Sequence, residues 1–277
     1  MTSPAPSSYP PIGVDIGGTG VKGGVVDLAI GDLIGERVRV ETPQPATPAA
    51  VADVVAEVIG GLGASGPVGL TVPAVVMHGV VRTAANIDEA WIGTDAEALF
   101  RERLGVDCLV LNDADAAGLA EVRFGAGKGR DGVVLVVTLG TGIGSGLFVD
   151  GTLVPNSELG HIQLKGRDAE EFAAESVREV DDLSWKKWGR RVGTYLRHLD
   201  ALFSPELFII GGGVSKKFDR YTDYLEVDTE VVPATLQNQA GIVGAALALS
   251  EARAPSPLPP PLPPHLPAFP PPAPRGV

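Results

Sequence analysis

The 277-residue sequence is poor in cysteine and in positive charge. Its one cysteine, Cys108, excludes an intramolecular disulfide and any zinc site built from several cysteines, and its apolar neighbours predict a buried thiol. The sequence has 22 Lys and Arg against 34 Asp and Glu, a net charge of −12. Because proteins that bind nucleic acid are usually basic, this balance argues against a nucleic-acid partner.

A membrane-spanning apolar run is also missing. The longest apolar stretch, residues 132–149, is interrupted by Gly and Thr, which predicts a hairpin and no membrane contact. No charged-then-apolar leader opens the sequence, so we expect a cytoplasmic protein with a flexible start over residues 1–11. Half of residues 254–277 are proline, which predicts a disordered or extended tail. The tail is either a ligand for a proline-binding domain or an extension without a catalytic part.

Against these absences stands a glycine-rich motif that occurs twice. Each copy is an apolar strand, a turn of Gly and Thr, and a second apolar strand. The copies contain Asp15, Gly17, Gly18, Thr19, Gly20 and Lys22, and then Gly140, Thr141, Gly142 and Gly144. A third cluster, Gly211, Gly212 and Gly213, follows another apolar strand. Glycine has no Cβ, so such turns can bring backbone amides close to phosphate.

The residues beside the first turn allow two interpretations each. Asp15 would either help to organise Mg²⁺ beside phosphates or cap the turn, and Lys22 would either contact phosphate or lie on a solvated edge. Gly18, Gly20 and Gly23 also match the dinucleotide fingerprint, with Glu41 at a suitable distance. That fingerprint must open a helix, whereas residues 21–27 have the pattern of a strand, which argues against a nicotinamide site.

Asp113 is the main catalytic candidate, because it ends an apolar strand and opens a helical segment. A carboxylate at such a cleft edge can accept a hydroxyl proton during phosphoryl transfer, and the alternative is a helix cap without chemistry. Further strands are expected at 68–72, 109–111, 133–137, 146–149 and 207–210, and helices at 49–62, 94–104, 114–125, 184–203 and 242–252. This alternation predicts an α/β protein of two lobes.

Polar residues that suit a sugar follow the second hairpin and an earlier strand. The first group includes Glu158 and His161, and the second includes Asn86, while Asn112 stands beside the candidate base. Such side chains can donate to and accept from hydroxyls, although each group alone is also compatible with an ordinary polar loop or turn. Cations gather on the helix at 184–203, and with two loop residues they form a possible strip for a polyanion or simply a solvated face: Lys165, Arg167, Lys186, Lys187, Arg190 and Arg191.

The motifs around Asp15, Asp113, Thr141 and His161, taken together, resemble the ROK (repressor, open reading frame, kinase) sugar kinases over residues 12–252, and most of all their polyphosphate glucokinase branch. The resemblance implies an actin-like (ribonuclease H-like) two-lobed fold with a small lobe at 12–115, joined by the helix at 240–252, and a large lobe at 116–239. It also implies Mg²⁺, a homodimer and phosphorylation of the glucose 6-hydroxyl. Asp113 would be the general base, Asn86, Asn112, Glu158 and His161 would bind sugar, and Gly18, Thr19, Thr141 and Gly142 would face phosphates.

The sequence departs from most ROK kinases after His161, where a cysteine-rich zinc motif is replaced by residues 165–172 without cysteine. We therefore expect no zinc. A sugar-binding Glu that usually follows that motif corresponds to Glu170 or to its neighbour Glu171. Too few residues precede the first strand for the DNA-binding domain of ROK repressors. The predicted donor is polyphosphate, with ATP also possible. The alternatives are an ATP-dependent kinase for mannose or N-acetylmannosamine and a non-catalytic sugar sensor.

Overall fold

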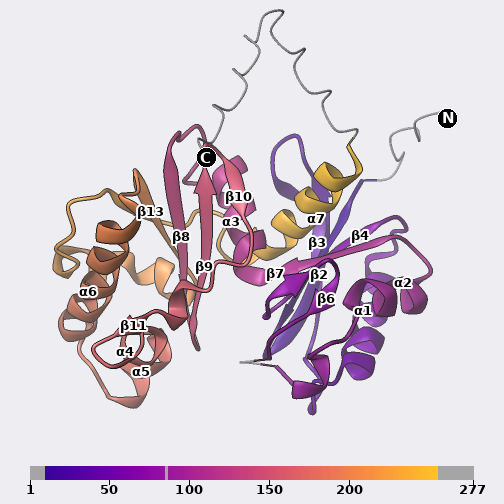
Figure 1. Cartoon of the computed structure of the whole chain (residues 1–277). Coiled ribbons are helices and arrows are strands. Elements are labelled where there is room, and N and C mark those ends of the chain that lie inside the picture. Colours follow the sequence, from indigo (N-terminus) through magenta and orange to yellow (C-terminus); the bar gives the residue numbers. More distant parts are fainter. Residues whose placement is uncertain (1–9, 85–86, 255–277) are drawn as a thin grey trace, which may run out of the picture.

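A computed structural model describes residues 10–84 and 87–254 and contains two five-stranded sheets, one in each half of the molecule (Figure 1). The first sheet has the order β3 (Asp32–Val40), β2 (Gly20–Asp27), β1 (Ile12–Gly17), β4 (Val68–Val72) and β7 (Cys108–Asn112). The second has the order β10 (Thr152–Val154), β9 (Ile143–Val149), β8 (Val133–Leu139), β13 (Leu207–Gly211) and β14 (Val231–Pro233). Both sheets are mixed, since each begins with an antiparallel hairpin and continues with parallel strands.

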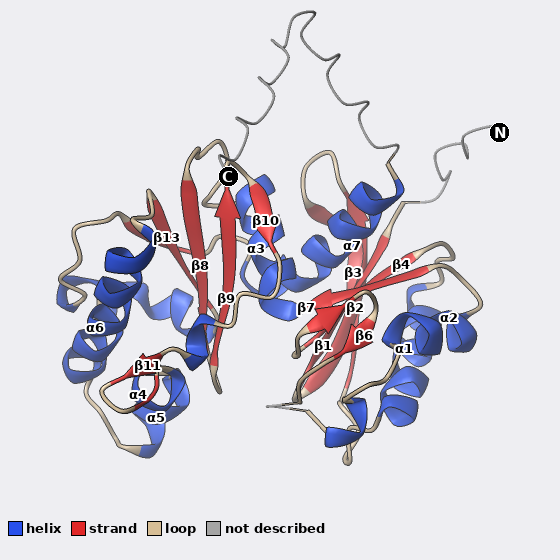
Figure 2. Ribbon diagram, in the orientation of Figure 1, coloured by secondary structure: helices blue, strands red, loops and turns tan. Residues whose placement is uncertain are grey.

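Helices cover both faces of the two sheets (Figure 2). They are α1 (Pro48–Leu62), α2 (Ala96–Leu104), α3 (Asp113–Arg123), α4 (Glu170–Ala173), α5 (Glu175–Val180), α6 (Trp185–Phe203) and α7 (Ala240–Arg253). Two short hairpins, β5 (Val76–Met77) with β6 (Val80–Val81) and β11 (Gln163–Leu164) with β12 (Arg167–Asp168), project from the loops. The 3₁₀ segment η3 (Gly213–Arg220) follows β13.

Helices α3 and α7 lie between the two sheets and pack against each other (Figure 1). A Cβ at Gly244 of α7 would overlap the carbonyl oxygen of Ala116 in α3, so the crossing requires glycine. On its other side α3 meets β9, where a Cβ at Gly118 would lie 2.6 Å from the ring of Phe148. Helix α3 therefore connects the two halves of the molecule and carries the candidate base Asp113 as its first residue. The predicted lobe boundary after residue 115 falls inside this helix.

The predicted helices and strands are confirmed, and none of their ends differs by more than three residues. Cap chemistry accounts for several of these ends: Thr47 accepts from the backbone of Ala50, and Asp95 accepts from Ala98. Helix α6 begins after the predicted cap Ser184, whose hydroxyl accepts from Lys187 N–H, and turns its apolar side to the second sheet. Residues 20–27 form strand β2, so the fingerprint of a dinucleotide site does not open a helix here.

Candidate active site

A cavity of about 470 Å³ lies at the carboxyl ends of β1, β7 and β13 and beside both glycine hairpins. The predicted residues in its wall are Gly17, Gly18, Thr19, Asn112, Asp113, Gly140, Thr141, Gly142, Gly144, Glu158, His161, Glu170 and Gly212. Pro73, Ala74, Thr83, Thr138, Leu139 and Ile143 complete it. Five predicted residues do not line it: Asp15, Gly20, Lys22, Gly211 and Gly213. Asn86 lies outside the described residues.

Asp113 is the first residue of α3 and faces the cavity. Burial is the main cause that raises the pKa of its carboxyl from 3.8 to about 7; the charges of Asp15 and Glu158 also raise this pKa, and the hydrogen bond from the N–H group of Ala114 lowers it. That N–H group donates to Asp113 Oδ1 at 2.8 Å. A carboxyl with this pKa exchanges a proton near neutral pH, which is what a general base requires.

Asp15, at the end of β1, is fixed by two contacts. Its Oδ2 lies 3.3 Å from Lys22 Nζ, and its Oδ1 accepts from the hydroxyl of Thr71 at 3.1 Å. Gly241 of α7 leaves room for this carboxylate, since a Cβ there would lie 2.9 Å from Asp15 Cγ. Lys22 thus pairs with Asp15. Thr71 escaped sequence analysis because it is 56 residues away from Asp15 in the chain.

The two hairpins are held from outside through their carbonyl groups. In the first, Thr42 donates to the oxygen of Gly17 at 2.5 Å and Arg39 donates to that of Thr19 at 2.9 Å. In the second, Ser176 of α5 donates to Gly140 O from its backbone at 3.1 Å and to Thr141 O from its hydroxyl at 2.6 Å.

Gly212 is the glycine of the third cluster that reaches the cavity. Its φ is +81°, and a Cβ there would overlap the carbonyl oxygen of Leu139. No other residue type fits this position without moving β8. Gly213, the next residue, opens η3 beside Glu175 of α5.

The sugar-binding candidates Glu158, His161 and Glu170 form a linked polar group beside the second hairpin. His161 Nδ1 lies 3.0 Å from Asp168 Oδ2, and its Nε2 lies 3.8 Å from Glu158 Oε2. The hydrogen bond with Asp168 is the main cause of a raised His161 pKa, and burial raises the pKa of Glu158. Asp168 was missed by the sequence analysis, although it stands seven residues after His161, in the short hairpin that brings it back.

The two alternatives for the second glutamate differ in position. Glu170 lines the cavity, and its Oε2 accepts from the backbone N–H of Ile143 at 3.2 Å. Glu171 is exposed and absent from the cavity wall. The structure therefore brings Glu170, and not Glu171, to the polar group.

Asn112 is largely occupied by structural contacts. Its Oδ1 caps α3 by accepting from the N–H groups of Ala114 and Asp115, at 2.8 and 3.0 Å. Its Nδ2 donates to the carbonyl oxygen of Ala74 at 3.2 Å, which leaves one amide hydrogen to face a ligand.

Asn156 ties the loop that carries Glu158 to both halves of the molecule. Its side chain pairs with the backbone of Val76 through two hydrogen bonds of 3.0 Å, and its N–H donates to Asp115 Oδ2 at 2.8 Å. Its φ is +59°, a conformation that Asn tolerates better than most residues. These contacts join positions 41 and 80 residues apart, so the sequence pattern around Asn156 did not reveal them.

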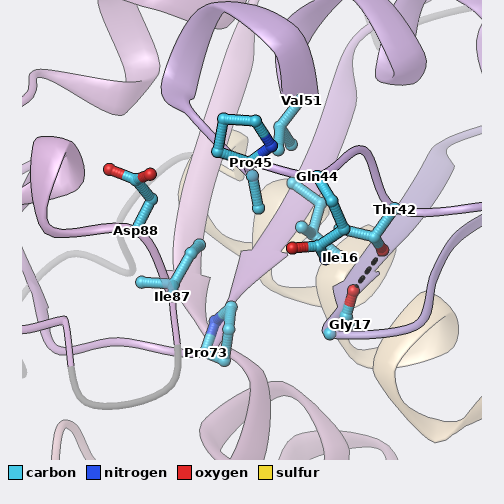
Figure 3. Close-up of a pocket in the computed structure, with 11 residues that line it drawn as sticks. Ile16, Gly17, Thr42, Gln44, Pro45, Val51, Pro73, Ile87 and Asp88 are labelled. Carbon is cyan, nitrogen blue, oxygen red and sulfur yellow. Dashed lines mark hydrogen bonds between the residues drawn. The ribbon is translucent and has the colours of Figure 1, made fainter.

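A second cavity, of about 290 Å³, adjoins the first hairpin and shares Gly17, Gly18 and Pro73 with the first cavity (Figure 3). Thr42, whose hydroxyl holds Gly17, lies in its wall together with Gln44 and Asp88. It contains none of the catalytic candidates.

The cations of the predicted strip fall into separate groups. Lys165, Arg167 and Arg191 stack on the ring of Phe172 at 5.1 to 5.4 Å, and Arg191 also pairs with Asp181 at 3.1 Å. Lys186 lies 5.8 Å from the ring of Tyr224, while Lys187 and Arg190 are exposed on α6.

Within residues 10–84 and 87–254, no three His, Cys, Asp or Glu side chains converge as ligands of a metal ion. The helices of these same residues include none that is both long and apolar enough to cross a bilayer. Cys108 is buried, and burial raises the pKa of its thiol to about 12.

Comparisons with known proteins point to one family. Residues 11–175 match the ROK family. The chain is similar to the polyphosphate glucokinase of Mycobacterium tuberculosis, with 55% identity over 237 residues that cover 85% of this chain and 89% of the relative.

Two solved structures share the fold. The inorganic polyphosphate/ATP-glucomannokinase of Arthrobacter sp. strain KM has a TM-score of 0.86 and 54% identity, over 88% of this chain and 100% of that one. A ROK family glucokinase of Streptomyces griseus, solved with glucose and AMPPNP, has a TM-score of 0.74 and 28% identity, over 86% and 98%. The predicted actin-like fold is thereby confirmed. On the strength of the matched residues and of this identity, the chain belongs to the ROK family.

Proposed function

We propose that this protein is a polyphosphate-dependent glucokinase that transfers a terminal phosphoryl group to the 6-hydroxyl of glucose. The observation that carries the proposal is the position of Asp113, with a pKa near 7, between two glycine hairpins and a polar group that includes Glu158 and His161. The similarity to enzymes named polyphosphate glucokinase and polyphosphate/ATP-glucomannokinase supports the donor and the sugar.

In the proposed reaction, glucose lies against Asn112, Glu158, His161 and Glu170, with its 6-hydroxyl at Asp113. Asp113 accepts the hydroxyl proton as the oxygen attacks the terminal phosphorus, and the bond to the bridging oxygen of the donor breaks. Backbone amides of the two hairpins stabilise the charge on the transferred group.

Mg²⁺ is part of this proposal. Asp15 is a carboxylate near the first hairpin with Lys22 as its one ion-pair partner in the described chain, and its charge raises the pKa of Asp113. An oxygen ligand in a negatively charged corner suits Mg²⁺, and the ion, when bound with the phosphates, would neutralise their charge. ATP as a second donor, a homodimer and a cytoplasmic location are likewise proposals, supported by the family resemblance.

The test is the formation of glucose 6-phosphate with Mg²⁺, with polyphosphate and ATP as parallel donors. Turnover with polyphosphate supports the proposal. Turnover with ATP alone, or with mannose or N-acetylmannosamine in place of glucose, assigns the site to another ROK kinase. Sugar binding without turnover of any donor would indicate a sensor.

Asp113→Asn provides the matched control for chemistry. We expect kcat to fall by about 10²- to 10⁴-fold, the contribution typical of a general base, with little change in glucose binding. Near-normal turnover would remove Asp113 from the mechanism.

A further inference from the structure

Helix α5 and segment η3 adjoin the second hairpin and Gly212, at the phosphate end of the cavity. Helix α5 is attached to the second hairpin by Ser176, which donates to the carbonyl groups of Gly140 and Thr141. Segment η3 begins at Gly213, where a Cβ would lie 3.5 Å from Glu175 Oε2 of α5. A phosphate chain that continues past the hairpins and Gly212 therefore next meets these two elements.

Three cations from these elements converge on one aromatic ring. Arg178 of α5 lies 4.3 Å from the centre of the Trp185 ring, and Lys217 and Arg220 of η3 lie at 5.6 and 5.7 Å. We call these four residues the Trp185 cluster. Its three cations are other residues than those that stack on Phe172 and those exposed on α6, although Trp185 itself is the first residue of α6.

The cluster carries positive charge that the protein itself only partly balances. Arg178 lies 3.2 Å from Glu179 and 4.0 Å from Glu175. Lys217 and Arg220 are exposed, and neither has a carboxylate within 4.0 Å in residues 10–84 and 87–254. In a protein of net charge −12, like charges held around one ring attract an anion and repel one another without it.

From this arrangement we propose that the Trp185 cluster binds the distal phosphates of the polyphosphate donor, beyond those held by the glycine hairpins. The inference rests on the proposed function. The Trp185 cluster takes the place of the predicted strip on α6 as the main binding path of the polyphosphate, because the cluster adjoins the second hairpin through Ser176 and Gly212 through Gly213.

The faces of the indole distinguish this ligand from a nucleotide base. Tyr221 stacks on Trp185 with an interplanar angle of 17° and a centre distance of 6.0 Å, and Arg178 covers the ring at 4.3 Å. Trp185 is thus occupied by its own neighbours and serves as a platform for cations, whereas a base would need a free face on which to stack. A cluster of positive side chains whose aromatic ring has no free face is suited to bind a polymer of phosphates.

The experiment compares donors of different length in the full-length protein. In the double variant Lys217→Gln/Arg220→Gln, we expect the KM for long-chain polyphosphate to rise by about fivefold or more, since two exposed charge contacts are lost. The glucose KM and the kcat with tripolyphosphate should not change, because tripolyphosphate ends at the hairpins; this activity also reports that the variant is folded. The salt dependence of the long-chain KM should weaken.

Two further variants complete the design. Arg37→Gln/Lys128→Gln removes two exposed charges that lie away from the cavity, and its long-chain KM should match that of the parent. Lys187→Gln/Arg190→Gln tests the alternative path on α6. An unchanged long-chain KM in Lys217→Gln/Arg220→Gln, or a loss confined to the α6 pair, overturns the inference while the proposed function stands. A parent enzyme that does not use polyphosphate overturns both.

Discussion

The pKa of Asp113 predicts a steep loss of activity between pH 8 and pH 6. Burial and the charges of Asp15 and Glu158 raise this pKa from 3.8 to about 7. The reactive carboxylate would then make up roughly nine tenths of the enzyme at pH 8 and one tenth at pH 6, whereas an unperturbed aspartate would be ionised at both. We therefore expect kcat/KM for glucose to fall about tenfold over this range, because kcat/KM reports the free enzyme.

The assay is glucose 6-phosphate formation from polyphosphate between pH 5.5 and 9, at constant ionic strength. The terminal phosphate of the donor also titrates, with a pKa of about 6. Glu158→Gln separates the two groups. Removing the Glu158 charge lowers the pKa of Asp113 and moves the acid limb to lower pH, but leaves the titration of the donor unchanged. A profile that is flat down to pH 5.5, or an acid limb that does not move in Glu158→Gln, would refute the assignment.

Three further predictions concern stability and sugar binding. Because folding raises the Asp113 pKa, the free energy of unfolding falls as pH rises from 3.8 to about 7. Asp113→Asn should therefore raise the free energy of unfolding at pH 8 by at most about 4 kcal/mol, and should leave it unchanged near pH 4. Thermal melts at the two pH values measure this as a higher Tm at pH 8 alone. Asp168→Asn should lower the His161 pKa in an NMR titration and raise the glucose KM; an unmoved pKa contradicts the role of Asp168. Asn156→Asp loses the hydrogen bond from the side-chain amide to Val76 O and should lower the free energy of unfolding, measured with urea, by about 1–3 kcal/mol. An unchanged free energy of unfolding would show that this hydrogen bond does not stabilise the fold.

The parts of this fold that sequence analysis predicted are those made by near neighbours in the chain. The glycine turns, the cap at Ser184 and the strand before Asp113 each depend on residues within a few positions. Their conformations follow from local sterics and hydrogen bonding. For the same reason the sequence already argued against the fingerprint around Gly18, since residues 21–27 have the pattern of a strand without helical periodicity, and they form β2.

The parts that sequence analysis missed depend on contacts between distant segments. Thr71 holds Asp15 from 56 residues away, and Asn156 reaches Val76 across 80. Patterns of hydrophobicity carry no information about such pairs, because any hydroxyl or amide side chain satisfies the local pattern. The predicted strip on α6 was grouped by proximity in sequence, but the fold distributes its members over Phe172, Tyr224 and open solvent.

The two ends of the cavity are built from different groups. Substitutions at one end should therefore affect the choice of sugar, and substitutions at the other end should affect the KM of the donor. At the sugar end three polar side chains have a partner that fixes their direction: Asn112 contacts Ala74, His161 contacts Asp168, and Glu170 contacts Ile143. Fixed donors and acceptors discriminate among hydroxyl patterns, because a mismatch leaves a polar group unpaired. Changes there should alter the choice of sugar.

At the donor end the hairpins present backbone, held by Thr42 and Ser176 from behind. Every unit of a polyphosphate chain is alike, so this end needs charge and close approach rather than a pattern of side chains. Substitutions at Ser176 or in the Trp185 cluster should therefore change the KM of the donor and leave the order of preference among sugars intact. A variant of Ser176 that alters sugar preference would show that the two ends are coupled through the second hairpin, where Glu170 also contacts Ile143.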